Sequence, residues 1–370
     1  MINVLEFERG VADGGAETLV RDYCLLIDKK KFNVLVACLF ANEKSANYKL
    51  MAGNKVKIFS IYRKWNMATR LFNRIFGEVY VSYRLKRYIN QNSINVVHGH
   101  VGVLKYLKPI SNFLHENKVK LLYTCHNLPE QYFGKKQGRE RTACVKLIKN
   151  NNLQLIALHA DMAAELNQLF GINNTIVVNN GIDFSKYETD FKSKEEIRQE
   201  LGIPKDAFVI GNIAKFAPQK NHRFIIEVFN ELLKKNNNGF LILVGAGPLK
   251  EDVIKQIKGY GIENRVLLLS HRNDVPVLLH AMDCFFFPSL FEGLGIVVVE
   301  AQKAGVKAVV ADTIPKAAYL SSNLIVKSLQ EPLDAWVNAI LYESANFEQH
   351  KDINEWDMRN VIKKLENIYQ

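Results

Sequence analysis

Cysteine is scarce in this sequence, and its spacing excludes two kinds of scaffold. The 370 residues contain five cysteines, Cys24, Cys38, Cys125, Cys144 and Cys284, with no Cys-x-x-Cys pair among them. Cysteine-ligated zinc sites and disulfide frameworks both need paired or clustered cysteines. We therefore expect five reduced thiols in the core. Cys125 and His126 are neighbours on an expected strand and point to opposite faces, which argues against a Cys–His catalytic dyad.

Long hydrophobic runs are also missing. A helix that spans a bilayer needs about 20 mostly apolar residues, and no such run occurs although 48% of the residues are hydrophobic. Met1 leads directly into the apolar run 2–7, without the basic start and cleavage site of a signal peptide. These features predict a cytoplasmic protein, and the apolar fraction is sufficient for two cores.

Acidic residues are few in the first half of the chain. Residues 1–185 contain 26 Lys and Arg against 14 Asp and Glu, so the net charge of +11 resides there. In residues 55–87, nine basic residues accompany one acid, Glu78, and apolar residues recur at helical spacing. Two interpretations stay open: a core-facing helix with a solvated outer side, or attachment to an anionic membrane surface, which would make the protein peripheral at the inner face of the plasma membrane. Nucleic acid is not expected as a partner, because no recognition motif accompanies the charge.

Short β-branched runs alternate with helical patterns along the chain, which predicts an α/β protein with parallel sheets covered by helices. The expected strands are residues 2–7, 34–39, 56–59, 95–98, 120–124, 153–157, 175–178, 208–213, 240–244, 266–269, 284–287 and 307–310. The polar segment 181–204 is the expected hinge between two doubly wound halves. In such halves, ligands bind at the carboxyl ends of the strands, so we expect the chemistry in a cleft between them.

The segment 288–300, PSLFEGLGIVVVE, follows one of these strands and carries two carboxylates. Gly293 and Gly295 leave backbone amides uncovered at the start of the next helix, which suits a phosphate. Glu292 would lie in the loop and Glu300 about one turn inside the helix. The alternative is that Glu292 only complements the helix dipole and Glu300 is a surface charge.

Two lysines follow another strand of the same half. In IGNIAKFAPQKNH, residues 210–222, Lys215 and Lys220 could neutralise a diphosphate without a metal and stabilise it as a leaving group, or simply be solvated. No Asp-x-Asp motif, which would favour Mg²⁺, occurs in the chain. The nearby LVGAGP, 243–248, is similar to the start of a dinucleotide fingerprint, but Lys250 takes the place of the third glycine, which argues against a dehydrogenase.

Polar residues also follow strands of the first half. Gly14 and Gly15 lie between the first strand and its helix, where they would expose amides or form a plain turn. His126 ends another strand and would point into the cleft. His98 and His100 form a His-x-His pair without an evident third ligand, so no metal site is predicted.

Together these segments resemble the retaining glycosyltransferases of family 4, especially bacterial enzymes of capsule and exopolysaccharide assembly. The resemblance runs in order through GGAET, TCHN, NNGID, QKNH, LVGAGPL, DVPVLL and PSLFEGLGIVVVEAQ. It implies the GT-B fold of two facing Rossmann-like domains. Residues 1–182 would form an acceptor-side domain, to which the C-terminal helix 354–370 crosses back, and residues 183–353 a nucleotide-sugar-binding domain.

The resemblance also implies which residues bind a UDP-sugar. These are Gly15, Lys215, Lys220, His271, Arg272, Glu292, Gly293, Leu294, Gly295, Ile296 and Glu300. Glu292 would contact the sugar hydroxyls, Glu300 the ribose, and the amides of 293–296 the distal phosphate. The two lysines would hold the diphosphate, Gly15 would close over it, and the backbone of 271–272 would read the base, uracil.

The implied catalytic set is His126, Glu292, Lys215 and Lys220. His126 would hydrogen-bond the sugar near the reacting carbon. The leaving phosphate would take the acceptor's proton in a front-side displacement that retains the anomeric configuration, so no metal or other cofactor is expected.

Two departures from the family pattern stand out. The position of Lys215 is usually arginine, so a point charge replaces a bidentate fork. The family often has glutamate near 313–316, where this chain has Ala317.

The sequence therefore predicts a metal-independent, retaining hexosyl- or N-acetylhexosaminyltransferase. Its acceptor would be a saccharide or a polyprenyl-diphosphate-linked saccharide in bacterial surface polysaccharide synthesis. A nucleotide-sugar epimerase and a non-catalytic partner of another glycosyltransferase are the alternatives.

Overall fold

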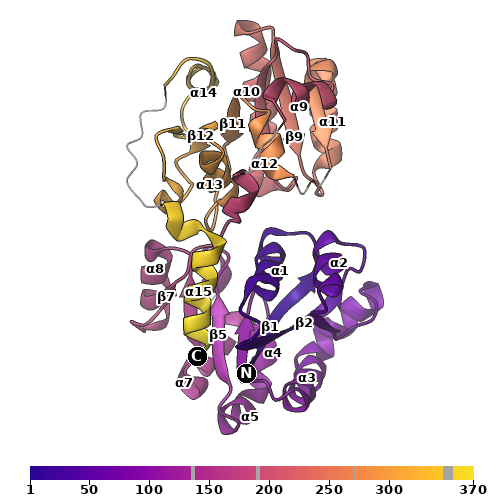
Figure 1. The fold of residues 1–370 in the computed structure, drawn as a ribbon, viewed down its shortest axis with the longest axis vertical. Coiled ribbons are helices and arrows are strands. Elements are labelled where there is room, and N and C mark those ends of the chain that lie inside the picture. The colour runs from indigo at the N-terminus through magenta and orange to yellow at the C-terminus, as the bar shows by residue number, and fades with distance from the viewer. Residues whose placement is uncertain (135–137, 189–191, 271, 273, 345–352) are drawn as a thin grey trace. The chain divides into compact units, whose positions relative to one another are not determined.

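The computed structural model describes residues 1–134, 138–188, 192–270, 272, 274–344 and 353–370. Its contacts divide the chain into two units. Unit 1 comprises Met1–Gly181 and Glu355–Gln370, and unit 2 comprises Ile182–Asn354. Each unit has one parallel sheet with helices on both faces (Figure 1), as the alternation of β-branched runs and helical patterns predicted.

Unit 1 is built on a seven-stranded sheet of order β3-β2-β1-β4-β5-β6-β7. Its strands are β1 (Ile2–Val11), β2 (Phe32–Ala41), β3 (Lys57–Ser60), β4 (Val96–Gly99), β5 (Lys120–Thr124), β6 (Gln154–Ala157) and β7 (Ile176–Val177). Its α-helices are α1 (Gly15–Leu26), α2 (Ala46–Gly53), α3 (Met67–Gln91), α4 (Leu104–Leu107), α5 (Ser111–Glu116), α6 (Pro129–Phe133), α7 (Arg139–Asn151), α8 (Ala160–Phe170) and α15 (Met358–Tyr369).

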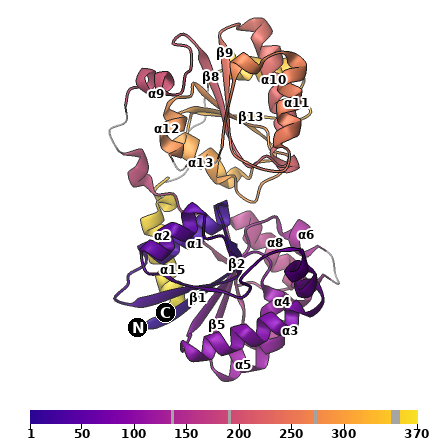
Figure 2. The same ribbon diagram turned by 90° about the vertical axis from the view of Figure 1, so that its right-hand side faces the viewer.

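Helix α15 returns to unit 1 and completes its core. Figure 2 shows α1 and α15 on one face of the sheet, with α3, α4 and α5 on the other. Leu365 and Tyr369 of α15 are buried in one cluster with Val4 of β1. The return needs a glycine at 181, because a Cβ there would lie 2.9 Å from the backbone Cα of Met358.

Unit 2 is built on a six-stranded sheet of order β10-β9-β8-β11-β12-β13, the doubly wound order of a Rossmann fold. Its strands are β8 (Phe208–Ile213), β9 (Gly239–Val244), β10 (Val266–Leu269), β11 (Cys284–Phe287), β12 (Lys307–Ala311) and β13 (Leu324–Lys327). Its α-helices are α9 (Lys194–Glu200), α10 (His222–Lys235), α11 (Lys250–Tyr260), α12 (Val275–His280), α13 (Ile296–Lys303) and α14 (Leu333–Leu341). The large side chains of Phe216, Phe229, Phe286 and Trp336 fill its main core.

The expected hinge contains a helix that the sequence reading missed. Helix α9 lies within residues 181–204, and a capping box holds its start: the Ser193 side chain accepts from the Glu196 amide, and the Glu196 carboxylate accepts from the Ser193 amide. The sequence did not reveal this helix, because its residues are mostly polar and show no apolar periodicity. Strand β13 and helix α14 were also not predicted.

Helix α3 has a core-facing side, as one of the two interpretations of the basic segment held, but that side is formed by other residues than those that suggested it. Its buried residues are Gly77, Val81, Ser82, Leu85 and Ile89. Most of the apolar residues that suggested a core-facing helix instead lie on the solvated side, including Ile75, which is 63% exposed, and Val79, which is 74% exposed. The outer side of this helix is therefore both basic and apolar.

All five cysteines are buried and unpaired, as expected. Among the described residues, no helix combines the length and the hydropathy that crossing a bilayer requires.

The packing of α15 predicts a stability change that is confined to unit 1. Leu365→Ala removes a side chain that is 1% exposed, so we expect the free energy of unfolding of unit 1 to fall by about 2–5 kcal/mol. Lys364→Ala, at an exposed position of the same helix, is the matched control. Urea unfolding followed by hydrogen exchange of each unit measures both changes, and equal effects of the two variants would contradict the packing role.

Candidate active site

The candidate residues of unit 2 follow two neighbouring strands, β8 and β11, at the point where the strand order reverses. These strands pair through Ile210 with Cys284 and Gly211 with Phe285. Their carboxyl ends lead into the loops that carry Lys215, Lys220 and Glu292. In a doubly wound sheet, this reversal opens the crevice in which ligands bind.

Backbone and amide hydrogen bonds fasten these two loops to each other. The Leu290 amide donates to the Gln219 carbonyl over 2.8 Å, and Gln219 Nε2 donates to the Phe291 carbonyl over 2.8 Å. Asn221 Nδ2 donates to the Pro288 carbonyl over 3.2 Å. The register of the loops is thus fixed by groups next to the charged residues.

Lys220 and Glu292 meet between the fastened loops. Lys220 Nζ lies 2.5 Å from Glu292 Oε1, and 5.0 Å from the centre of the Phe287 ring. Glu292 is only 6% exposed. A carboxylate this deeply buried needs a charged partner, so the ammonium and the carboxylate hold each other in place. The sequence indicated both residues but not their contact.

Lys215 lies on the 214–216 loop, whose position depends on two glycines. A Cβ on Gly245 would lie 2.0 Å from the Ala214 carbonyl oxygen, and one on Gly247 would lie 2.3 Å from the Phe216 carbonyl oxygen. The glycines of LVGAGP therefore permit close packing of this loop. The Lys215 side chain is exposed and makes no hydrogen bond or ion pair with the described residues.

The loop after Glu292 leads into α13, and two of its backbone amides have no acceptor among the described residues. Gly295 is the N-cap residue and has a φ of +77°, which favours glycine. Within the described residues, the amides of Leu294 and Ile296 donate no hydrogen bond. The first amides of a helix lack intrahelical acceptors and attract anions. Gly293 lies in the connection between Glu292 and these amides.

Glu300 lies on α13 and contacts the segment that opens unit 2. The Tyr187 hydroxyl donates to Glu300 Oε1 over 3.1 Å. Burial raises the pKa of Glu300 to about 7, against lowering by the Tyr187 hydrogen bond and the Lys186 charge. Its charge therefore changes near neutral pH, which a surface carboxylate would not do.

Three further polar side chains near these loops were missed by sequence reasoning. Asn212 Oδ1, Ser289 Oγ and both ring nitrogens of His222 are buried without a hydrogen-bond partner among the described residues. Burial, and then the Lys220 charge, lowers the pKa of His222 to about 4. Buried polar atoms without partners are rare in folded proteins. Their position at strand and loop ends was the only available signal.

Three other positions singled out in the sequence are His271, Arg272 and Ala317. His271 lies outside the described residues. Arg272, beyond the end of β10, donates from Nε to Asp274 Oδ1 over 2.7 Å, so its side chain is engaged locally. Ala317 lies in the short 3-10 helix Lys316–Ala318 and supplies no carboxylate.

In unit 1, His126 ends a chain of hydrogen bonds that begins at a buried carboxylate. Glu6 Oε2 lies 2.7 Å from His100 Nε2, and His100 Nδ1 lies 2.9 Å from His126 Nε2. Burial alone would raise the pKa of Glu6, but the His98 charge and hydrogen bonds from His100 and His98 hold it well below its usual range. Burial lowers the pKa of His100 to about 4 and that of His126 well below its usual value.

These charge states fix the direction of each hydrogen bond. An ionised Glu6 only accepts, so His100 donates through Nε2 and its neutral Nδ1 accepts. His126 must then donate through Nε2, which leaves its Nδ1 as an unprotonated acceptor. His126 therefore carries a neutral ring nitrogen, Nδ1, that can accept a hydrogen bond.

His98 belongs to the same cluster and ties it to α15. His98 Nε2 lies 2.7 Å from Thr124 Oγ1, and the Tyr369 hydroxyl lies 2.8 Å from His98 Nδ1 and 2.7 Å from Glu6 Oε1. Glu6, His98 and His100 offer the types of ligand atom that could hold a metal ion. Each of these groups also has hydrogen-bond partners in the cluster, which account for its burial. Glu6 is the third member of this set, and the sequence did not reveal it.

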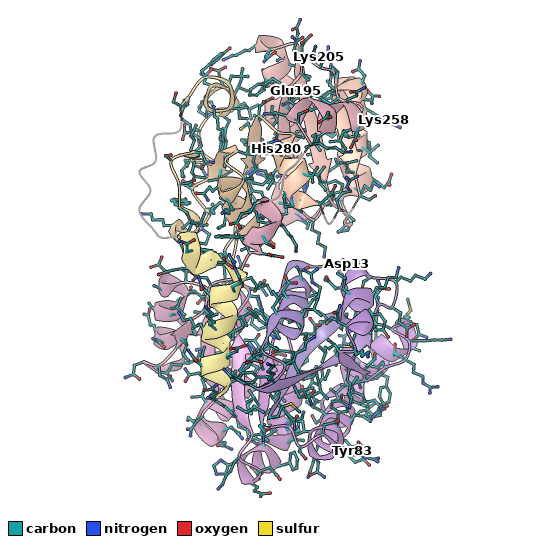
Figure 3. The ribbon with its side chains drawn as sticks, in the orientation of Figure 1. Asp13, Tyr83, Glu195, Lys205, Lys258 and His280 are labelled. Atoms are coloured by element: carbon teal, nitrogen blue, oxygen red, sulfur yellow. The ribbon has the colours of Figure 1, made fainter. Side chains whose placement is uncertain are left out.

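Gly15 begins α1 at the same edge of the unit 1 sheet. Figure 3 shows Asp13 where β1 leads toward α1, and Asp13 Oδ1 accepts from the Asn47 amide over 3.1 Å. A Cβ on Gly15 would meet nothing within 4 Å. Folding of unit 1 therefore does not require glycine here, which leaves a ligand role open to test.

Family comparisons cover most of the chain in two blocks. Residues 13–186 match Glycosyltransferase Family 4, and residues 193–349 match Glycosyl transferases group 1.

Individual proteins give a consistent result. The chain is 26% identical over 353 residues to EpsF of Bacillus subtilis (strain 168), a protein named as a glycosyltransferase, covering 92% of this chain and 88% of EpsF. It is 26% identical over 212 residues to the UDP-Gal:alpha-D-GlcNAc-diphosphoundecaprenol alpha-1,3-galactosyltransferase of Escherichia coli, covering 52% of this chain and 53% of that enzyme.

Among solved structures, Anabaena HepE in complex with UDP and glucose superposes with a TM-score of 0.78 at 20% identity, covering 100% of this chain and 99% of HepE. This likeness shows the GT-B fold. The two family matches, which together span most of the chain, and the EpsF relationship confirm the family resemblance drawn from the motifs: the chain belongs to the family 4, group 1 glycosyltransferases.

Proposed function

We propose that this glycosyltransferase transfers a hexose or N-acetylhexosamine from a UDP-sugar to a polyprenyl-diphosphate-linked saccharide, with retention and without a metal, in bacterial surface polysaccharide synthesis. The observation that carries the proposal is the Lys220–Glu292 pair, 2.5 Å apart at the carboxyl ends of β8 and β11. A site for a nucleotide sugar needs cations for the diphosphate and acceptors for the sugar hydroxyls. This pair supplies one of each at adjoining positions.

The donor diphosphate would lie over Lys215, Lys220 and the first amides of α13. Two ammonium groups and a helix N-terminus stabilise the charge that develops on the leaving diphosphate. The exposed Lys215 is free to turn toward a ligand, whereas Lys220 is held by Glu292. Neutralisation by lysines and amides is the reason for proposing a metal-independent reaction.

Glu292 would accept hydrogen bonds from the sugar hydroxyls while it orients Lys220. The acceptor oxygen forms a bond to the anomeric carbon as the bond from that carbon to the diphosphate oxygen breaks. The acceptor's proton passes to the leaving phosphate on the same face. His126, with an unprotonated Nδ1, would accept from a sugar hydroxyl and would not supply a proton.

Two of the similar proteins support the choice of substrates. The Escherichia coli relative is named for UDP-Gal and a diphosphoundecaprenol acceptor, and the HepE complex contains UDP and glucose. The alternatives of an epimerase or a non-catalytic partner have no comparable support. Lys215 and Ala317 remain departures from the usual family pattern.

Glu292→Gln tests the central pair. The substitution keeps the side-chain volume but removes the charge that orients Lys220, so we expect kcat/KM for transfer to fall by about a hundredfold or more. UDP release with a panel of UDP-sugars measures the effect, and thermal melting checks folding. Glu263→Gln, an exposed position before β10 at the opposite edge of the sheet, is the control. Transfer by E292Q at the wild-type rate would refute the mechanism.

The pKa of Glu300 predicts a pH dependence of nucleotide binding. Ribose hydroxyls donate to the ionised carboxylate, and with a pKa of about 7 this form is lost as the pH falls through neutrality. We expect affinity for UDP to fall by up to about tenfold from pH 8 to pH 6. Calorimetry should show a smaller change in Glu300→Gln than in the wild type, because the variant retains only the part of the pH dependence that comes from the UDP phosphate. A pH profile of UDP affinity in E300Q equal to that of the wild type would exclude Glu300 from the ribose site.

The hydrogen-bond chain to His126 predicts the effect of Glu6→Gln. A neutral amide no longer fixes the His100 tautomer, so we expect kcat/KM to fall by about tenfold or more and a second His126 tautomer to appear in ¹⁵N NMR spectra. Glu8→Gln is the matched control: Glu8 is a buried carboxyl of the same strand whose pKa is raised by burial and by the charges of Glu17 and Glu6. A single, unchanged His126 tautomer in E6Q would exclude this positioning role.

A further inference from the structure

A pocket of about 420 Å³ lies in unit 1, apart from every residue assigned above. Arg9, Trp65, Arg70, Asn73 and Arg74 line it. Arg9 lies near the carboxyl end of β1, and Trp65 lies in the loop between β3 and α3. In a parallel sheet both positions lie at the carboxyl edge, the edge that also carries Gly15 and His126.

Two of the residues that line this pocket, Asn73 and Trp65, are held in place by neighbouring side chains. Asn73 Nδ2 donates to the Tyr106 hydroxyl over 3.0 Å, and the Tyr62 hydroxyl donates to Asn73 Oδ1 over 3.1 Å. Trp65 stacks on Phe40 with ring centres 5.0 Å apart and an interplanar angle of 12°. The pocket is therefore framed by fixed groups.

The three arginines of the pocket carry unbalanced positive charge. Arg9, Arg70 and Arg74 are exposed, and none makes a salt bridge or side-chain hydrogen bond with the described residues. Arg70 and Arg74 are four residues apart on α3, a spacing at which like charges destabilise a helix. Guanidinium groups bind phosphate oxygens through paired N–H donors. Charge complementarity thus points to a phosphate-bearing ligand.

An aromatic path leads from the pocket to the apolar outer side of α3. Trp65 lies 5.6 Å from Tyr62, Tyr62 lies 6.5 Å from Phe72, and Phe72 lies 5.4 Å from Phe76, measured between ring centres. Phe76 is 57% exposed. Leu71, Ile75 and Tyr83 are exposed along the same helix, and Tyr83 lies at the outer surface of unit 1 in Figure 3.

We infer that the arginine pocket binds the diphosphate of the lipid-linked acceptor, and that the outer side of α3 covers the first isoprene units of its chain. This inference rests on the proposed function, which it extends from the donor to the acceptor. A free phosphate would use the arginines alone. The packed rings place the charged pocket next to the exposed apolar side chains of α3, which fits a molecule in which a diphosphate is joined to a hydrocarbon.

Calorimetry with farnesyl diphosphate tests the pocket in the full chain, with UDP added to saturation so that the donor site is occupied. Arg70→Gln with Arg74→Gln removes two charges from the pocket. We expect affinity for farnesyl diphosphate to fall by about tenfold or more. Lys86→Gln with Arg87→Gln removes two charges from the same helix outside the pocket, and its affinity should stay within about twofold of the wild type.

Leu71→Gln with Ile75→Gln separates a lipid diphosphate from a free one. It should weaken binding of farnesyl diphosphate and leave binding of inorganic pyrophosphate unchanged. All of these side chains are exposed, and thermal melting checks that each variant folds.

Three outcomes would overturn the inference: undiminished binding by the R70Q/R74Q protein, an equal loss in the K86Q/R87Q protein, or farnesol binding as tightly as farnesyl diphosphate. Failure of the wild type to bind UDP would instead count against the proposed function, and the same farnesyl diphosphate titration without UDP would still test the pocket.

Discussion

The ion pair between Lys220 and Glu292 is the contact on which the candidate site of unit 2 depends. The buried Glu292 carboxylate depends on the half-buried Lys220, because an unpaired charge at this depth strongly destabilises the fold. The pair holds because the Gln219 and Asn221 amides fasten the two loops on either side of it. The fold thus brings a cation and an anion to one point from segments 72 residues apart.

Much of this arrangement could be predicted from the sequence, because it follows from local patterns. The strands of unit 2 that precede Lys215 and Glu292 agree with the structure to within a residue, since β-branched runs bounded by turns specify them. Once the strands are placed, a parallel sheet puts both loops at one edge. The family and the fold were predicted correctly from the order of the motifs. The ligand roles of the individual site residues remain predictions.

The remainder depends on contacts that no local pattern encodes. Glu6 reads as a strand residue, and its partners His100 and Tyr369 lie 94 and 363 residues away. Their meeting requires the strand order and the return of α15. Helix α3 was misjudged for a different reason: helical spacing shows that an apolar face exists but not which way it turns. The buried side of α3 is instead lined by Val81, Leu85 and Ile89.

The return of α15 also has a consequence for the order in which the chain acquires structure. Unit 2 is an insertion in unit 1, since residues on both sides of it in the sequence share one core. Every strand of unit 2 is synthesised before Leu365 and Tyr369. Unit 2 can therefore close its core first, whereas one face of the amino-terminal sheet stays only partly covered, by α1, until α15 is made. The segment made first is the one completed last.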